Sequence, residues 1–517
     1  MRRYLFLGVF TAGCTSLAVE LAASRLLGNY FGSSNLVWAS VIGLILIYLS
    51  VGYSIGGKWA DRSPHHRTLF TILVWASFFV GLIPLASRPV LKFASEAFDQ
   101  LRLGAMAGSF VTVLAIFSAP VILLGTASPF AVRLALEDTK SSGSVAGKIY
   151  AISTLGSFIG TFLPVLVLIP AVGTYRTFLV LSGVLMLVSL AGLAKAEDLK
   201  AALRFIWMPI LIGIVSLFAL RGPDKAAENI IFEDESAYNY IQVQEIDGYH
   251  ILRLNEGQGI HSIYHPDQIG YGGPWEQVLT APFFNPPSSN PERVDHIAIL
   301  GLAAGTSANQ AVVVFPNADI DGFEIDQAIV NVGFNYFALG NSEPDIFVQD
   351  ARWGLSASSD SYDIISVDAY RPPYIPWHLT TVEFFKDVSD HLDADGVLVI
   401  NVARIFQDRR LLDALYQTIQ SVFPSAYIVD LPNTLNSMIF ATKAETDSAN
   451  LVRNYILLSE KEGTPSVLLS ALEIAITSQQ APPKVGIVLT DDRAPVEWII
   501  NRMMFDLFSS GGIEVLQ

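Results

Sequence analysis

Acidic residues and glycines follow four successive strand-like runs in the second half of the sequence. Glycines let a backbone approach a ligand closely, and a carboxylate about 20 residues after a glycine turn suits a ribose diol. Together these residues predict a nucleoside site. The alternative for any single aspartate is that it merely caps a turn or the next helix. The residues are Gly301 and Gly305 after the first run, Glu324 and Asp326 after the second, Asp350 and Ala351 after the third, and Asp368 and Tyr370 after the fourth.

Strands and helices that alternate along residues 290–517 must position these side chains. Alternation of this kind predicts a doubly wound parallel sheet, whose ligands bind at the carboxyl ends of the strands. The turn after the first strand lacks the third glycine of the dinucleotide fingerprint, which disfavours NAD. Strands are expected at 296–300, 320–325, 345–348, 362–367, 396–402, 426–431 and 437–442, and helices at 307–314, 327–337, 381–392 and 409–422.

A smaller β-domain is expected at residues 230–282, before this sheet. Residues 240–245 and 250–254 alternate between apolar and polar types and contain β-formers, which indicates a short antiparallel sheet. A stretch rich in proline, serine and asparagine at 282–291 separates this small domain from the larger sheet.

Residues 1–222 carry seven apolar runs that are long enough, or nearly so, to cross a bilayer of about 30 Å. The sequence therefore predicts a multi-pass helical membrane domain. Polar loops are expected at 58–67, 88–103 and 133–148. The apolar runs are 4–27, 37–56, 68–85, 110–130, 149–172, 177–194 and 205–220.

Lysine and arginine predict how this domain is oriented. The loops on the side of the N-terminus are the more basic, so the N-terminus is expected in the cytoplasm. No small-residue cleavage site followed by a polar segment is evident after the first span, so this span is expected to stay uncleaved. Seven spans would then place the C-terminal half outside, away from cytosolic nucleotides. Because the spans 68–85 and 205–220 are short enough to be miscounted, the side of the soluble half stays open.

Glu20 lies deep in the first span, where a charge is expensive, so a functional role is the first hypothesis. The alternative is a neutral glutamate that is hydrogen-bonded inside the bundle. The single cysteine, Cys14, excludes an intramolecular disulfide and a cysteine-based metal site. His261 and His265 are four apart, but the neighbouring glycines argue against a helix, and no metal site is predicted.

Charge is distributed very unevenly. Residues 1–220 hold 16 basic and 8 acidic residues, and the rest of the chain holds 16 basic and 40 acidic ones. The acidic half would repel nucleic acid and anionic lipid. It could attract a cationic substrate. The alternative is that the acidity merely keeps a tethered domain soluble.

With these residues the chain resembles the spermidine synthase family of aminopropyltransferases, in particular its membrane-fused bacterial members. The resemblance covers residues 235–402 well, and also 148–156 and 490–497. It implies that the α/β domain is a Rossmann-like domain of methyltransferase-like type, preceded by the small β-domain. It implies transfer of an aminopropyl group from decarboxylated S-adenosylmethionine to an amine such as putrescine, without a permanently bound cofactor. It assigns Gly301 and Gly305 to the glycine loop, Glu324 to the ribose, Asp350 with Ala351 to the adenine, Gln258 to the nucleoside, Asp368 to the catalytic base and Tyr370 to the acceptor amine.

Three positions depart from the family pattern. Ala304 replaces the aspartate of the glycine loop, Arg371 replaces the second aspartate of an Asp-x-x-Asp motif, and Trp275-Glu276-Gln277 stands where a tyrosine usually precedes a Gln-Glu pair. An arginine suits a carboxylate better than an ammonium, so intact S-adenosylmethionine is an alternative donor.

Two other functions remain open: a transport or sensor protein whose soluble domain binds a nucleoside without catalysis, and an S-adenosylmethionine-dependent transferase with another acceptor. The expected partners are membrane lipid and a small amine or related acceptor, with no nucleic acid. The sequence leaves a homo-oligomer open.

Overall fold

The computed structural model describes ten stretches of the chain. These are residues 1–32, 35–99, 103–136, 142–225, 227–255, 257, 259–287, 290–370, 374–404 and 408–509. They form two compact units. The first contains Met1–Ile241 and Leu254–Gln258, and the second contains Gln242–Arg253 and Gly259–Gln517. The predicted three-domain division stays a prediction.

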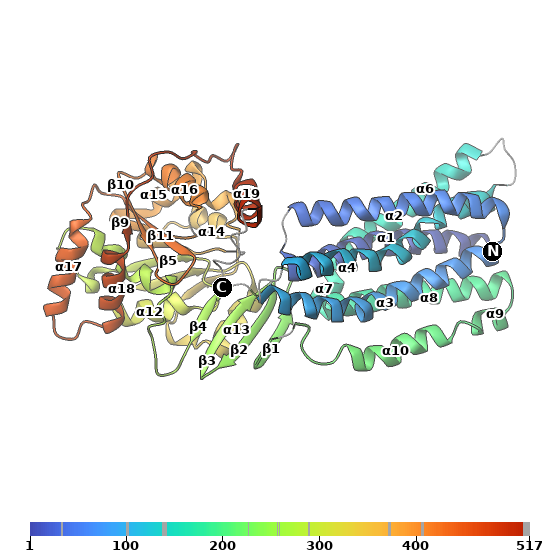
Figure 1. The fold of residues 1–517 in the computed structure, drawn as a ribbon, viewed down its shortest axis with the longest axis horizontal. Coiled ribbons are helices and arrows are strands. Elements are labelled where there is room, and N and C mark those ends of the chain that lie inside the picture. Colours follow the sequence, from blue (N-terminus) through green and yellow to red (C-terminus); the bar gives the residue numbers. More distant parts are fainter. Residues whose placement is uncertain are drawn as a thin grey trace. The chain divides into compact units, whose positions relative to one another are not determined.

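Long apolar helices form the first unit, and seven helical segments among the described residues are long and apolar enough to cross a membrane. The helix α1 contacts α2, α3, α4, α5, α6 and α8, and the long helices run side by side in Figure 1. Their bounds are α1 Arg2–Phe31, α2 Asn35–Arg62, α3 His66–Asp99, α4 Leu103–Gly125, α5 Ala127–Ala135, α6 Ser142–Leu163, the π-helical turn η2 Pro164–Leu168, α7 Ile169–Val172, α8 Thr174–Ala196, α9 Leu199–Leu203 and α10 Trp207–Ala219.

The loop expected at residues 88–103 is wrong over most of its length, because α3 continues to Asp99. Leu91 and Ala94 are buried and keep the extension packed on the bundle. Arg88 is buried too. Its guanidinium forms an ion pair with Asp224 at 3.0 Å and donates hydrogen bonds to the backbone carbonyls of residues 219–223. A buried arginine that is satisfied in this way does not end the helix.

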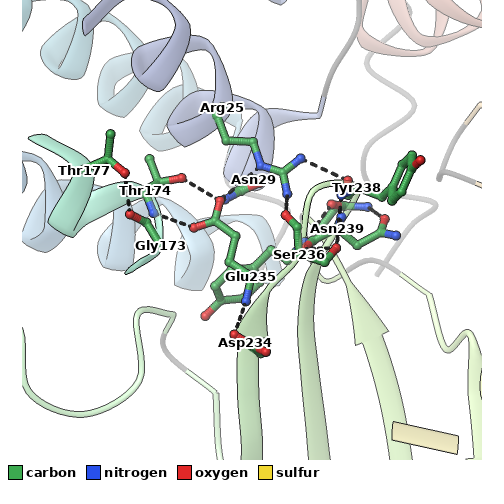
Figure 2. A network of polar contacts seen from close by, with 12 residues as sticks. Arg25, Asn29, Gly173, Thr174, Thr177, Asp234, Glu235, Ser236, Tyr238 and Asn239 are labelled. Carbon is green, nitrogen blue, oxygen red and sulfur yellow. Dashed lines mark hydrogen bonds and ion pairs between the residues drawn. The ribbon is translucent and has the colours of Figure 1, made fainter. Parts of the chain in front are cut away.

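Glu235 ties β1 (Ile230–Glu235) to two helices of the same unit, as Figure 2 shows. Its Oε1 accepts hydrogen bonds from Arg25 at 3.1 Å, from Asn29 at 2.9 Å and from the Thr174 hydroxyl at 2.6 Å. Its Oε2 accepts one from the Thr174 backbone N–H at 2.7 Å. A carboxylate at the N-terminus of α8 is stabilised by the free N–H groups and the helix dipole.

Four strands form a small sheet in the order β1-β2-β3-β4, of which two were expected from the sequence. The strands β2, β3 and β4 are Tyr240–Ile246, Tyr249–Leu254 and Ser262–Tyr264. The last two pair antiparallel, with Ile251 opposite Ile263.

An eight-stranded sheet forms the centre of the second unit, in the order β12-β10-β11-β9-β8-β5-β6-β7. The five strands β5 to β9 are mutually parallel, as predicted, whereas β10, β11 and β12 pair antiparallel. The wholly parallel sheet was therefore wrong at one edge. A turn of a few residues joins β10 to β11, and such a short connection permits only antiparallel pairing. The strands are β5 His296–Leu300, β6 Asp319–Phe323, β7 Asp345–Phe347, β8 Tyr362–Val367, β9 Leu392–Ala403, β10 Ser425–Asp430, β11 Asn436–Thr442 and β12 Gln479–Gln480.

Helices cover both faces of this sheet (Figure 1). Neighbouring residues of β8 point to opposite faces, so Ile365 packs with α14, α15, α16 and α19, and Ile364 packs with α12, α17 and α18. The predicted helices are confirmed to within two residues at each end. The helices are α11 Pro274–Gln277, α12 Thr306–Val314, α13 Gln327–Tyr336, α14 Ala351–Ala357, α15 Val382–His391, α16 Arg410–Gln420, α17 Ala449–Glu460, α18 Ser466–Thr477 and α19 Val496–Ser509, with 3-10 turns at Val278–Phe284, Pro291–Arg293, Leu339–Asn341 and Trp377–Leu379.

Candidate active site

The carboxyl ends of β8, β5, β6 and β7 lie next to one another, which brings the predicted residues to one edge of the sheet. The first residue after each of β8, β5 and β6 still donates one backbone hydrogen bond to the neighbouring strand. The backbone N–H of Asp368 donates to Leu300 at 2.9 Å, and that of Gly301 donates to Phe323 at 2.9 Å. Likewise, the N–H of Glu324 donates to the carbonyl of Phe347 at 3.1 Å. Asp368, Gly301 and Glu324 therefore stand side by side.

Gly301 is required by this close approach of two strand ends. It has a φ of 98°, a conformation that favours glycine. A Cβ atom at Gly301 would lie 2.6 Å from the backbone nitrogen of Ala369, which is closer than real Cβ contacts. Gly305 has a φ of 94° and begins α12, where a Cβ atom would meet Leu339 at 2.3 Å. Both glycines thus shape the turn.

Glu324 is buried at the end of β6 and accepts two backbone hydrogen bonds. Its Oε2 accepts from the N–H of Ala303 at 3.0 Å, and its Oε1 accepts from the N–H of Asp326 at 3.0 Å. Burial raises the pKa of Glu324 to about 7, and the backbone hydrogen bonds oppose that rise. Since each carboxylate oxygen can accept a second hydrogen bond, both can still receive a diol.

Asp368 is half-buried beside the Gly301 turn, and its hydrogen bond comes from a residue that the sequence analysis missed. The Asn401 side-chain amide donates to Oδ1 of Asp368 at 2.9 Å. Burial raises the pKa of Asp368 to about 7, and the hydrogen bond from Asn401 opposes the rise. A carboxyl with a pKa near 7 suits a general base. The one polar residue in the apolar run of β9 could have drawn attention to Asn401.

Tyr370 is half-buried two residues beyond Asp368, and its hydroxyl accepts a hydrogen bond from the backbone N–H of Ala403. Burial raises its pKa above the usual value, so the phenol is neutral. The hydroxyl is thus held at the end of β9, the strand that also carries Asn401.

Asp326 and Asp350 both cap helices. Oδ1 of Asp326 accepts from the N–H of Ala328 at 3.1 Å and begins α13. Oδ1 of Asp350 accepts from the N–H groups of Arg352 and Trp353 at 3.0 and 3.1 Å, and Ala351 becomes the first, buried residue of α14. The capping alternative therefore describes these two aspartates, whereas Glu324 and Asp368 cap no helix.

A network of polar side chains holds Asp350 in place, and the sequence analysis did not anticipate it. Oδ2 of Asp350 lies 3.0 Å from Nε2 of His378. Arg352 donates to the backbone carbonyl of His378 and forms a two-pronged ion pair with Asp491 at 2.8 Å. Asp491 also accepts from the Thr381 hydroxyl at 2.7 Å. Because these residues are far apart in the sequence, no local pattern shows the network.

The departures from the family pattern lie in buried surroundings where the structure describes them. Ala304 is buried, and its N–H donates to the hydroxyl of Ser262 at 3.0 Å. Glu276 accepts hydrogen bonds from Gly273 at 2.7 Å and from Gln310 at 3.0 Å, so it braces a turn. Arg371, and Gln258 of the nucleoside set, lie outside the described residues.

Several exposed apolar side chains lie near Glu324 and Asp350 in the chain. Ile325 follows Glu324, and Val348 and Trp353 flank Asp350. Trp377, also exposed, precedes His378, which contacts Asp350. Flat apolar surfaces next to a few polar groups are typical of sites for aromatic ligands. Among the residues that the structure describes, no group of three histidine, cysteine, aspartate or glutamate residues could hold a metal ion.

Residues 286–454 match the spermine/spermidine synthase domain, a region that contains every strand-end residue described above. This part of the chain is therefore similar to the spermine/spermidine synthase domain.

The chain is similar to proteins that are named polyamine aminopropyltransferases. A probable polyamine aminopropyl transferase of Bifidobacterium longum is 33% identical over 282 residues, which are 52% of this chain and 62% of that protein. The chain thus spans somewhat less than two thirds of that relative. A polyamine aminopropyltransferase of Ralstonia nicotianae is 22% identical over 414 residues, 77% of this chain and 78% of that protein. Because 77% of this chain is more than its soluble half, the match extends into the helical half.

The crystal structure of a probable spermidine synthase from Corynebacterium glutamicum is similar to half of this chain. It is 18% identical, with a TM-score of 0.39, and the match covers 50% of this chain and 98% of that one.

Proposed function

We propose that this protein is a membrane-anchored aminopropyltransferase, which moves an aminopropyl group from decarboxylated S-adenosylmethionine to a small amine. The synthase domain and the aminopropyltransferase relatives support the class of reaction. The observation that carries the proposal is the position of Asp368: it lies beside Gly301, which in turn lies beside Glu324, and its pKa is about 7.

Each residue has a role in the proposed reaction. Glu324 accepts the ribose hydroxyls, and the exposed apolar side chains near Asp350 cover the adenine. The acceptor nitrogen attacks the aminopropyl carbon next to sulfur, the carbon–sulfur bond breaks, and the sulfonium becomes a neutral thioether. Asp368 takes the proton that the acceptor nitrogen releases, and Tyr370 orients the amine.

A product assay with the full chain tests this proposal. We expect detergent-purified protein to convert putrescine and decarboxylated S-adenosylmethionine to spermidine and methylthioadenosine. Asp368→Asn should lower kcat/KM at least 100-fold. The matched control is Asp345→Asn. Asp345 is an exposed aspartate at the amino end of β7, whereas the candidate site lies at the carboxyl ends of the strands. Equal activity of wild type and Asp368→Asn would refute the assignment of the base.

A second candidate differs only in the donor. Ala304 is buried where the family carries an aspartate, so this position offers no carboxylate to a cationic aminopropyl group. Intact S-adenosylmethionine, which carries a carboxylate of its own, is therefore the alternative donor. Isothermal titration of the full chain with both nucleosides separates the two: tighter binding of the intact form would favour the second candidate.

We also propose that the seven apolar helices span the membrane. The relative from Ralstonia supports a shared helical half, because its match extends into that half. With the N-terminus in the cytoplasm, seven spans place the synthase domain on the other side. Reporter fusions after residues 136 and 509 test this: activity of a cytoplasmic reporter at the second position would contradict it.

A further inference from the structure

A stripe of polar side chains lies on one face of α1, the helix that contacts most of the others in its unit. Ser16, Glu20 and Ser24 are spaced four residues apart, so they lie above one another with a rise of about 6 Å between neighbours. Their exposed fractions are 6%, 8% and 4%. The stripe therefore faces the interior of the helical unit.

The hydrogen-bonding groups of this stripe are unsatisfied by the protein. Hydroxyls elsewhere in the bundle bond to the preceding helical turn: Thr11 donates to Leu7 at 2.8 Å and Ser189 donates to Leu185 at 2.6 Å. In contrast, the hydroxyl oxygens of Ser16 and Ser24 have no hydrogen-bond partner within the described part of the chain. The Glu20 carboxylate likewise has no hydrogen bond or ion pair to any described residue. Buried polar groups in proteins are almost always paired, so two unpaired hydroxyls on the same face as a carboxylate without a protein partner indicate a missing partner.

The nearby basic side chains are already used. Arg25, just over one helical turn beyond Glu20, pairs with Glu235, and Arg88 of α3 pairs with Asp224. A carboxylate in the apolar interior must therefore take up a proton or a cation from outside the protein.

The π-helical turn η2 interrupts the neighbouring span at the level of Glu20. A Cβ atom at Gly156 would lie 2.2 Å from the carbonyl oxygen of Phe10, and one at Gly160 would lie 2.1 Å from that of Cys14. These two contacts have the same offset, so α1 and α6 run parallel, and the offset places Glu20 beside η2. The helix α1 does contact η2. Single π-helical turns occur frequently at functional sites.

We propose that Glu20, with the hydroxyl of Ser16 or of Ser24, forms a binding site for the primary ammonium group of a small amine within the helical bundle. An ammonium has three N–H donors, which match the two oxygens of the carboxylate and one hydroxyl oxygen. Ser16 and Ser24 are about 12 Å apart along the helix, so a single ammonium uses one of them at a time. Metal cations such as Ca²⁺ and Mg²⁺ take about six or more oxygen ligands, and this stripe offers too few at one level. The site shares its ligand class with the proposed acceptor of the synthase domain, but it does not depend on Asp368.

Equilibrium dialysis with radiolabelled putrescine tests the proposal on the full chain in lipid nanodiscs. We expect Glu20→Gln to bind one equivalent of putrescine per chain fewer than wild type. Ser16→Ala with Ser24→Ala should keep that equivalent with about tenfold weaker affinity. The matched control is Glu197→Gln, since Glu197 forms an accessible ion pair with Arg67 at a helix end, and it should bind as wild type does.

Two outcomes of the dialysis would overturn the site. One is that wild type and Glu20→Gln bind the same number of putrescine molecules per chain. The other is that sodium ions displace the bound putrescine at the same concentrations as methylammonium does. The difference between the two proteins is unaffected if aminopropyl transfer fails, because both retain the same synthase domain.

Labelling of wild type with a hydrophobic carbodiimide provides a second measurement that needs no variant. We expect the peptide containing Glu20 to be modified, and putrescine to prevent the modification. Absence of labelling, or labelling that putrescine does not reduce, would also count against the site.

Discussion

Removing the Asn401 amide should move the pH dependence of the transferase in a defined direction. The amide donates to Asp368 at 2.9 Å and favours the ionised carboxylate, so Asn401→Ala should raise the pKa of Asp368 above about 7. A hydrogen bond to a charged group contributes about 1.5 kcal/mol, and one pH unit corresponds to about 1.4 kcal/mol. The midpoint of the pH profile should therefore rise by about one unit.

The rate consequence depends on the protonation state. The base acts as a carboxylate, so activity is lost as pH falls through the pKa. At pH 7 the ionised fraction should drop from about one half to about one tenth, which lowers kcat/KM about fivefold. At pH 9 the variant and the wild type should nearly converge.

The assay is kcat/KM for the amine between pH 6 and pH 9.5. The control is Asn454→Ala: Asn454 is also a buried asparagine that donates to backbone carbonyls, but it lies on α17 and does not contact Asp368. It should cost stability without moving the midpoint. An unchanged midpoint in Asn401→Ala, or a loss of activity that is the same at every pH, would refute the reasoning.

Three further predictions concern stability and binding. Burial raises the pKa of Asp368 from 3.8 to about 7, so the fold loses stability as pH rises between these two values, where the unfolded chain has released the proton and the folded chain keeps it. Asp368→Asn should therefore raise the thermal midpoint relative to wild type at pH 8 but not at pH 4, and the opposite pattern would be inconsistent with burial. Glu324→Gln should weaken methylthioadenosine binding about tenfold in isothermal titration, and unchanged affinity would remove Glu324 from the ribose site. Glu235→Gln should destabilise the helical unit by about 3 kcal/mol, since Arg25 would be left without its charge partner; calorimetry of the double variant with Arg25→Met should show partial recovery if the pair is coupled.

Local patterns were sufficient to predict much of the second unit. Strand ends of a parallel sheet must meet at one edge, so the adjacency of Gly301, Glu324 and Asp368 could be predicted from the alternation of strands and helices alone. The long apolar runs predicted the seven helices for a similar reason, because length and composition are visible in sequence.

Other features depended on contacts between residues that are distant in sequence. The sequence could not show that Asn401 would donate to Asp368, or that Arg352 would bridge His378 and Asp491. It also offered no means to decide which of four similar carboxylates would cap a helix. The continuation of α3 through Arg88 depends on five partners that become available only when the chain folds.

A structure of the full chain with methylthioadenosine tests the central claim most directly. The account predicts the ribose hydroxyls on Glu324, the adenine at the end of β7, and the sulfur above the Gly301 turn within reach of Asp368. Density for the nucleoside at any other place, with the strand ends unoccupied, would contradict it.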